Sequence, residues 1–158
     1  MTKGLDQPIH VFRFELSLAP TDAAGGKPGT PETAGFAECT GLEATMEPKV
    51  IKEGGRNYGA VQRAGPVTFG TVVLKRGITG DSRLWDWFAE ATQRGFYAER
   101  QDVTITINNS NVNDTSPVQK WRLVRALPIK LKVPDLNARA SEVGIEELHL
   151  THEGMLKA

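Results

Sequence analysis

The sequence is short of cysteine and of long apolar runs. Cys39 is the single cysteine among 158 residues, so no internal disulfide can form and folding does not depend on an oxidising compartment. No stretch approaches the ~20 apolar residues of a membrane-spanning helix, and residues 1–8 lack the basic-then-apolar pattern of a signal peptide. We therefore expect a protein that is made in the cytoplasm and has no membrane segment.

The chain also lacks an excess of either charge. Its 19 Lys and Arg residues balance its 19 Asp and Glu residues, which excludes the basic field that nucleic-acid binding requires. We therefore expect no sequence-specific nucleic-acid binding. A neutral protein has little repulsion between its copies, so self-association is permitted. The length fits one domain, expected over residues 1–158.

Groups that carry chemistry are equally scarce. His149 and His152, two of the three histidines, lie three apart on a predicted strand and would point to opposite faces, which argues against a shared metal ion. Cys39 has no basic partner in a known motif and is interpreted as a small buried hydrophobe. The glycine-rich residues 53–59 lack the spacing of a phosphate-binding loop. We expect no enzyme activity, metal or cofactor.

What the sequence does contain is β-structure. Residues 12–18 alternate apolar and polar side chains, as in a strand with one buried face. Residues 19–35 are rich in Pro and Gly and are predicted to form a loop. Residues 43–75 are predicted to form a long hairpin with the loop 52–63 at its end. The apolar positions of the first strand are Phe12, Phe14, Leu16 and Leu18.

One helix is predicted at about residues 82–94. Asp81 or Ser82 can cap its first turn, and Gly95 can end it. Its apolar stripe consists of Leu84, Trp87, Phe88 and Ala91. Trp85 lies outside that stripe and is therefore available for an interface.

Further strands follow the helix. Residues 103–107 alternate, and residues 119–133 form a long segment in which Pro128 predicts a bend, a bulge or an edge. In the last strand the apolar side chains change from odd to even positions, which predicts a β-bulge at Glu146–Glu147. The fold class expected is mainly β: an antiparallel barrel or sandwich of about six strands, with one flanking helix and the extended hairpin.

Three interpretations concern individual side chains or pairs of them. Arg76 follows a strand and is expected to be a surface charge, with a contact between subunits as the alternative. The carboxylates of Glu146 and Glu147 are expected to be solvated. Val72 and Val73 follow Thr68 and Thr71 in an arm that is β-branched on both faces, so a neighbouring subunit is expected to cover it.

The chain resembles the tail tube protein family of contractile-tailed phages and phage-like injection systems over nearly its whole length. The residues that carry the resemblance are Phe12-Arg13-Phe14, Gly35-Phe36, Cys39 to Glu43, Lys52 to Asn57, Leu74 to Thr79, Leu84 to Trp87, Trp121, Leu127-Pro128, Asn137-Ala138, Ser141 to Val143 and His152 to Met155.

The resemblance implies a structural subunit that forms stacked hexameric rings around a channel. Implied partners are further copies of the chain, a sheath protein, baseplate and spike proteins, and protein or DNA cargo in the channel. Residues 19–35 depart from the simplest members, so a specialised end ring stays open as an alternative, as does a ring of the type VI secretion kind. A ligand-binding or enzymatic barrel is a third possibility, for which the sequence offers no pocket.

Individual residues are assigned to these surfaces as hypotheses. Thr104, Thr106 and Asn108 are possible channel-facing side chains, and the loops 19–35 and 52–63 are candidates for contacts between rings. An acidic residue in place of Val72 or Val73 is expected to impair ring formation more than folding. The predicted interface residues are Val72, Val73, Arg76, Trp85, Gly54, Gly55, Arg56 and Asn57.

Overall fold

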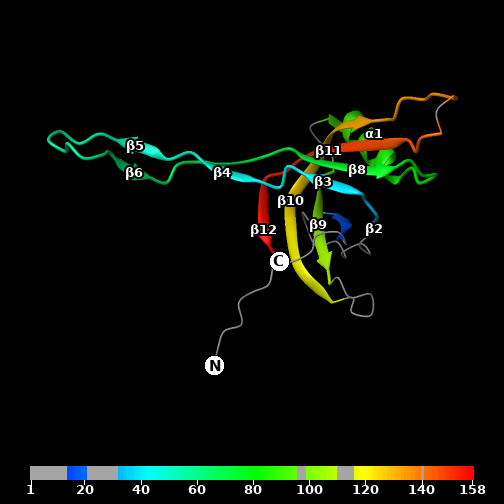
Figure 1. Ribbon diagram of the computed structural model, residues 1–158, viewed down its shortest axis with the longest axis horizontal. Helices are drawn as coiled ribbons and strands as arrows, with labels where there is room; N and C mark the ends of the chain where they lie inside the picture. Colours follow the sequence, from blue (N-terminus) through cyan, green and yellow to red (C-terminus); the bar gives the residue numbers. More distant parts are fainter. Residues whose placement is uncertain (1–13, 21–31, 96–98, 110–115, 140) are drawn as a thin grey trace.

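The computed structural model describes residues 14–20, 32–95, 99–109, 116–139 and 141–158 (Figure 1). Its largest unit is an antiparallel sheet with the order β2-β1-β9-β10-β11-β8-β3, in which β12 also pairs with β10. The strands of this sheet are β1 (Phe14–Pro20), β2 (Glu32–Ala34), β3 (Glu38–Thr40), β8 (Val72–Gly77), β9 (Gln101–Asn108), β10 (Pro117–Lys132), β11 (Ile145–Thr151) and β12 (Gly154–Lys157). The sheet is open, with β2 and β3 at its ends, and the mainly β, sandwich-like fold class is confirmed.

The alternation seen in the sequence places one face of this sheet in the core. Leu16 of β1 lies opposite Ile105 of β9, and both are buried. The core continues with Leu123 of β10 and Leu148 and Leu150 of β11. Burial of such side chains contributes roughly 1.5–3 kcal/mol each relative to exposure, so this face is the main source of stability.

The predicted helix is confirmed as α1 (Arg83–Arg94). Leu84, Trp87 and Ala91 are buried, and the helix packs against β10. The cap comes from Asp81, whose Oδ1 accepts a hydrogen bond from the backbone N–H of Arg83 at 3.1 Å. That hydrogen-bonded arrangement with Arg83 holds the pKa of the Asp81 carboxyl well below its usual range.

The long hairpin is also confirmed, and it projects away from the sheet (Figure 1). It consists of β4 (Ala44–Met46) paired with β7 (Val67–Phe69), followed by β5 (Lys49–Ile51) paired with β6 (Val61–Arg63). Because β6 begins at Val61, the connecting loop is shorter than the predicted 52–63. Gly41 allows the hairpin to leave β3: its φ is 83°, and a Cβ there would lie 1.9 Å from the Thr71 carbonyl oxygen.

The long segment after the helix forms β10, which changes partners along its length. Its first part pairs with β9 and β12 and its last part with β11. The predicted irregularity at Pro128 is confirmed as a register shift between Pro128 and Lys130. A second shift lies between Leu123 and Ala126, where Arg125 has a φ of 51° and its backbone N–H donates to Asp102 Oδ1 at 2.9 Å.

The predicted bulge at Glu146–Glu147 is wrong. The pairing of β11 with β8 runs without a shift from Ile145 opposite Gly77 to Leu150 opposite Val72. Val143 and Ile145 are exposed, so the apolar residues at odd positions lie on the outer surface. The inner face is continued by Glu146, opposite Arg76. The shift of the apolar residues from odd to even positions in this segment therefore reflects two separate apolar surfaces.

Other corrections concern the ends of elements. The predicted loop 19–35 contains the end of β1, which pairs with β9, and all of β2, which pairs with residues 16–18 of β1. Residues 21–31 of this loop lie outside the described part of the chain, as do His10 and Phe12. The expectation of about six strands is too low, because it omitted the short strands β2, β3 and β12 and the separate pairs within the hairpin. Segments of three or four residues carry too little periodicity to be recognised.

Candidate functional site

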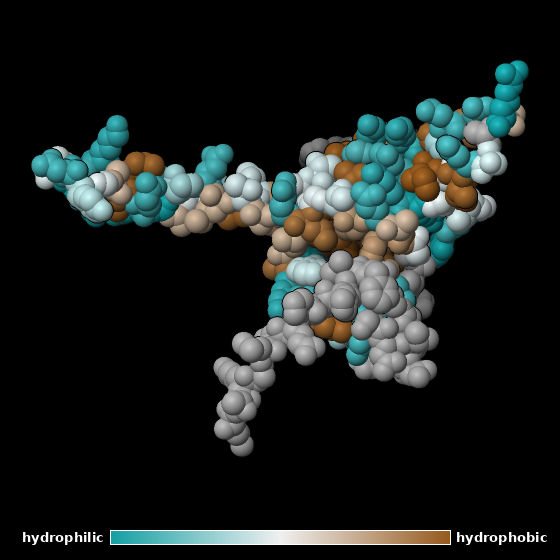
Figure 2. All heavy atoms as spheres, in the orientation of Figure 1, coloured by the Kyte–Doolittle hydropathy of each residue, from teal (hydrophilic) through white to brown (hydrophobic). Residues whose placement is uncertain are grey.

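The hairpin offers the most protruding surface of the protein. Met46, Val50, Tyr58 and Val67 have exposed fractions between 50% and 95%. Figure 2 shows this apolar surface along the projecting arm, interrupted by polar residues. Exposed apolar side chains on a protruding arm are typical of a surface that a partner covers.

The predicted interface residues at the tip of the hairpin are brought together by its turn. Gly54, Gly55, Arg56 and Asn57 are all exposed. Gly55 has a φ of 83°, which favours glycine at this turn. Arg56 lies 3.8 Å from Glu53 in an exposed ion pair. Such a pair contributes little to stability, so these side chains are available to a partner.

Val72 and Val73 are not part of the projecting arm but belong to β8 in the main sheet. Val72 is fully buried within the protomer, in the core cluster. Val73 is half-buried on the opposite face, in register with Thr40 and His149. The structure thus overturns the expectation for Val72, because a buried side chain has no surface to offer a neighbour and an acidic residue there would disrupt the fold itself.

Arg76 is buried rather than a surface charge. Its side chain is 6% exposed and is paired with Glu146 through Nε and with Asp81, whose Oδ2 lies 3.6 Å from Nη1. Nη2 also donates to the backbone carbonyl of Asp81 at 3.2 Å, and the guanidinium lies over the ring of Phe36. The Glu146 carboxylate is therefore not solvated as predicted, and Arg76 joins β8, β11 and the start of α1 inside the protomer.

Trp85 is where the sequence placed it, outside the buried stripe of α1. It is 53% exposed, and its ring lies 6.4 Å from that of Phe88 in a tilted arrangement. A half-exposed tryptophan presents a large apolar area with a hydrogen-bond donor. It remains a candidate contact residue.

The sheet has a polar face opposite the core. Thr104 of β9 lies between Ser17 of β1 and Arg122 of β10, and Thr106 lies between Glu15 and Lys120. Cross-strand partners share a face of a sheet, so these side chains form one continuous polar surface, which we call the polar sheet face. Asn108 is half-buried at the end of β9 and opposite Pro117.

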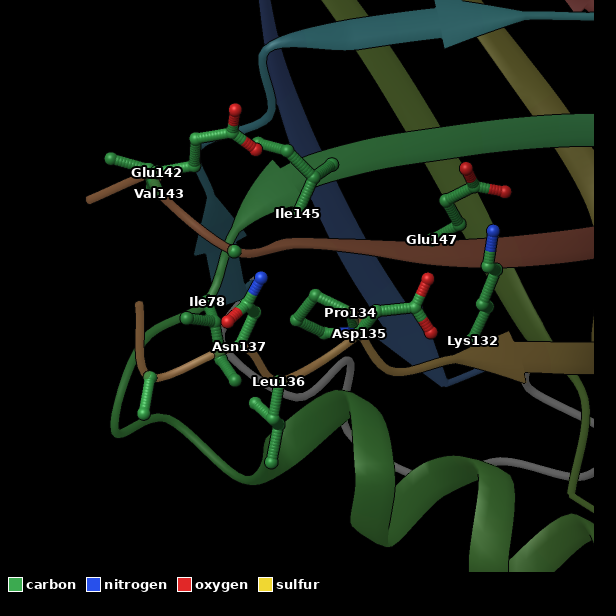
Figure 3. A pocket seen from close by; sticks show the side chains of 12 residues that line it. Ile78, Lys132, Pro134, Asp135, Leu136, Asn137, Glu142, Val143, Ile145 and Glu147 are labelled. Carbon is green, nitrogen blue, oxygen red and sulfur yellow. The ribbon is translucent and has the colours of Figure 1, made fainter. Parts of the chain in front are cut away.

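A groove that the sequence pattern did not indicate lies at the loop between β10 and β11. It has a volume of about 840 Å³ and is open to solvent (Figure 3). Four of its apolar side chains are exposed by 42% to 88%, and charged residues share its lining. The apolar ones are Ile78, Leu136, Val143 and Ile145. The sequence does contain a sign of this groove. Val143 and Ile145 are apolar residues at odd positions, which indicates a second apolar surface and not the predicted bulge.

The residues considered for chemistry do not form a reactive site. Cys39 lines a mostly apolar cavity of about 250 Å³ with Phe14 and Trp121, and burial raises the pKa of its thiol to about 11. His152 is buried against Phe69, and desolvation lowers its pKa. Within the described residues, no three His, Cys, Asp or Glu side chains gather as a metal site would require, and no helix is long and apolar enough to cross a membrane.

The sequence profile of the family "T4-like virus tail tube protein gp19" matches residues 10–156. The chain belongs to this tail tube family. It is therefore a structural tube protein, as the resemblance in the sequence implied. A search of curated proteins gives no match.

Solved structures agree with the tail tube fold. A chain of the anti-feeding prophage (AFP) baseplate, solved with sixfold symmetrisation, is 27% identical, with a TM-score of 0.80 and coverage of 98% of this chain and 97% of the other. A chain of the PVC extracellular contractile injection system, from its extended sheath–tube complex, is 22% identical (TM-score 0.79, coverage 98% and 93%). A chain of the PVC sheath/tube terminator is 21% identical (TM-score 0.79, coverage 98% and 99%).

Proposed function

We propose that this chain is a non-enzymatic tail tube domain spanning residues 1–158, whose copies form six-membered rings that stack into the inner tube of a contractile injection particle. The observation that carries the proposal is the combination of a tail tube match over residues 10–156 with an open sheet and a projecting hairpin. An open sheet leaves edges at β2 and β3, and a closed ring of copies is one way to cover them. The sixfold symmetrisation of the AFP baseplate structure supports the number six.

The polar sheet face is the proposed lining of the channel. It carries both signs of charge and the hydroxyl groups of Ser17, Thr104 and Thr106, and Leu156, opposite Arg122, is an exposed apolar residue on the same face. A lining of this kind lets protein or DNA cargo pass without hydrophobic adhesion. Sheath and baseplate proteins are the proposed outer partners, since the related chains come from sheath–tube and baseplate complexes.

The remaining interface hypotheses fit this assembly. The tip residues Gly54 to Asn57 and the exposed Trp85 are proposed contacts between copies or with the sheath, whereas Val72 and Arg76 are not, because they are buried in the protomer. We expect the particle, and not a membrane, to be the final location of the chain, following its synthesis in the cytoplasm.

Negative-stain microscopy of the purified chain tests the proposal. The expected result is rings with six subunits, or tubes built of such rings, at high protein concentration. Co-production with a sheath protein should give sheathed tubes, which distinguishes a contractile tail tube from a ring of the type VI secretion kind. A protein that stays monomeric at millimolar concentration would refute the proposal.

A role at the end of the tube is the second candidate, favoured by the match to a chain of the AFP baseplate. An end ring must expose one face that stops further stacking. It would give single rings that do not lengthen with concentration, whereas a main tube protein gives tubes whose length increases.

A further inference from the structure

One face of the hairpin combines positive charge with apolar side chains. Lys49 lies directly opposite Arg63, and Ile51 lies opposite Val61. Residues two apart on a strand share a face, so the four side chains form one surface, which we call the basic hairpin face. Like charges directly opposite each other on a strand pair are destabilising. A counter-charge from outside the pair would therefore stabilise the arrangement.

The described part of the chain does not supply that counter-charge. Both cations are exposed, and neither has an ion pair or hydrogen bond with another described residue. The hairpin as a whole is also basic, with four cationic and two acidic side chains between residues 44 and 69. These are Lys49, Lys52, Arg56 and Arg63 against Glu47 and Glu53.

The groove at the β10–β11 loop has the complementary composition. Its exposed apolar lining includes Leu136 and Val143, and its charged residues comprise one cation and three carboxylates: Lys132 against Asp135, Glu142 and Glu147. Asp135 and Glu142 are exposed and have no ion-pair partner among the described residues. Figure 3 shows both carboxylates beside the apolar side chains.

The two surfaces lie at opposite ends of the protomer (Figure 1). Figure 2 shows apolar surface at both ends. An arm of about 12 residues at ~3.3 Å per residue reaches about 40 Å from the sheet, so the hairpin points away from the groove of its own chain. Each surface is therefore left without its complement inside the molecule.

We infer that the basic hairpin face of one copy binds in the acidic, apolar-lined groove of a second copy. This inference rests on the proposed tube function and names the surface that receives the hairpin. The contact is head-to-tail: it uses two different surfaces, so every bound copy still offers a free groove and a free hairpin. Such a contact either closes into a ring or continues along a tube. Apolar contacts supply affinity, and the opposite charges set the register.

Two charge-reversed variants test this assignment. Lys49→Glu/Arg63→Glu makes the hairpin face acidic, and Asp135→Lys/Glu142→Lys makes the groove basic. All four side chains are exposed, so each variant should fold with a Tm within about 3 °C of wild type. Each alone should lower the assembled fraction, measured by sedimentation velocity, at least about tenfold.

Mixing the two variants is the decisive measurement. In the mixture the acidic hairpin fits the basic groove, and the native hairpin fits the native groove, so alternating assemblies should form at close to the wild-type level. The matched control is Arg94→Glu/Lys130→Glu, which changes the net charge equally at exposed sites outside both surfaces. It should assemble like wild type, and mixing it with the basic-groove variant should give no recovery beyond what the control forms alone.

The outcomes separate the two proposals. Failure of the wild-type chain to form rings would overturn the tube function. Wild-type rings together with variants that assemble normally, or variants whose mixture does not recover, would overturn only the hairpin–groove contact. Equal loss in the control would assign the effect to net charge and would also overturn the contact.

Discussion

The buried guanidinium of Arg76 gives the sharpest prediction about the protomer. Replacing it by Met removes the counter-ion of Glu146, whose side chain is only 16% exposed. Breaking a buried ion pair from one side costs about 3–5 kcal/mol, mainly because a charge is left buried and unpaired. Because Glu146 retains some access to water, we expect Arg76→Met to lower the free energy of unfolding by about 3 kcal/mol. For a chain of this size this corresponds to a fall in Tm of about 6–12 °C.

A second substitution shows whether the unpaired carboxylate of Glu146 causes the loss of stability. Adding Glu146→Leu removes that carboxylate, and an apolar pair in place of a buried ion pair is often neutral. The double variant should therefore be more stable than Arg76→Met alone. Lys75→Met is the matched control on the same strand: its pair with Glu38 is partly exposed, so its removal should cost less than about 1 kcal/mol.

The assay is urea unfolding followed by circular dichroism. It must use dilute protein that sediments as a monomer, because association of folded copies adds apparent stability. The reasoning is refuted if Arg76→Met and Lys75→Met are equally stable, or if Glu146→Leu makes Arg76→Met less stable still.

Three further predictions concern buried or half-buried side chains. Val72→Ala should lower the free energy of unfolding by about 2–3 kcal/mol, because it leaves a cavity at a fully buried site. Val67→Ala on the exposed hairpin should change the free energy of unfolding by less than about 0.5 kcal/mol. Urea titrations that give the reverse order would contradict the burial of Val72. Cys39, with a pKa of about 11, should react with iodoacetamide at pH 8 roughly 100-fold more slowly in the folded protein than in urea, and equal rates would show an accessible thiolate. His152 has a lowered pKa, so the unfolded chain binds its proton more readily: the stability linked to it is present above about pH 6.5 and is lost as the pH falls toward the folded-state pKa. Thermal melts between pH 7.5 and 5 should show a smaller loss in His152→Gln, and identical slopes would exclude this histidine as the cause.

The geometry around His152 explains the direction of that prediction. Its Nδ1 lies 3.0 Å from the Gly154 carbonyl oxygen, and because a carbonyl only accepts, Nδ1 carries the proton. Nε2 is buried and has no hydrogen-bond partner among the described residues. Protonation would place an unsatisfied N–H there, beside Phe69 at the base of the hairpin, so the neutral form is favoured in the folded protein.

The elements that were predictable from the sequence are those encoded locally. Alternation over residues 14–18 and 103–107 and the helical spacing of Leu84, Trp87 and Ala91 each span enough residues to define a buried face. The hairpin was predictable because a glycine-rich turn separates two extended segments. Pro128 predicted an irregularity because it lacks the N–H that a ladder needs.

The features that were not predictable depend on contacts between distant segments. Arg76 is neutralised by a residue 70 positions later in the chain, and without that partner an arginine after a strand is correctly expected on the surface. Val72 was assigned to an interface because β-branched residues cover both faces of its arm, and alternation cannot say which face the protomer covers. The groove exists only where Ile78, the loop after Lys132 and the segment before Ile145 meet.

A net charge of zero acquires a structural meaning once the charges are placed. The hairpin carries an excess of two cations and the groove an excess of two carboxylates, so the charges of these two surfaces offset each other within the neutral total. A chain with these two ends can bind its own copies without the long-range repulsion that a net charge would add with every subunit. Because neither surface is complementary to itself, a dimer leaves both a hairpin and a groove unfilled. With the proposed hairpin–groove contact, growth would stop only when a ring closes or a different protein occupies the last surface, which is the behaviour that a tube of defined ends requires.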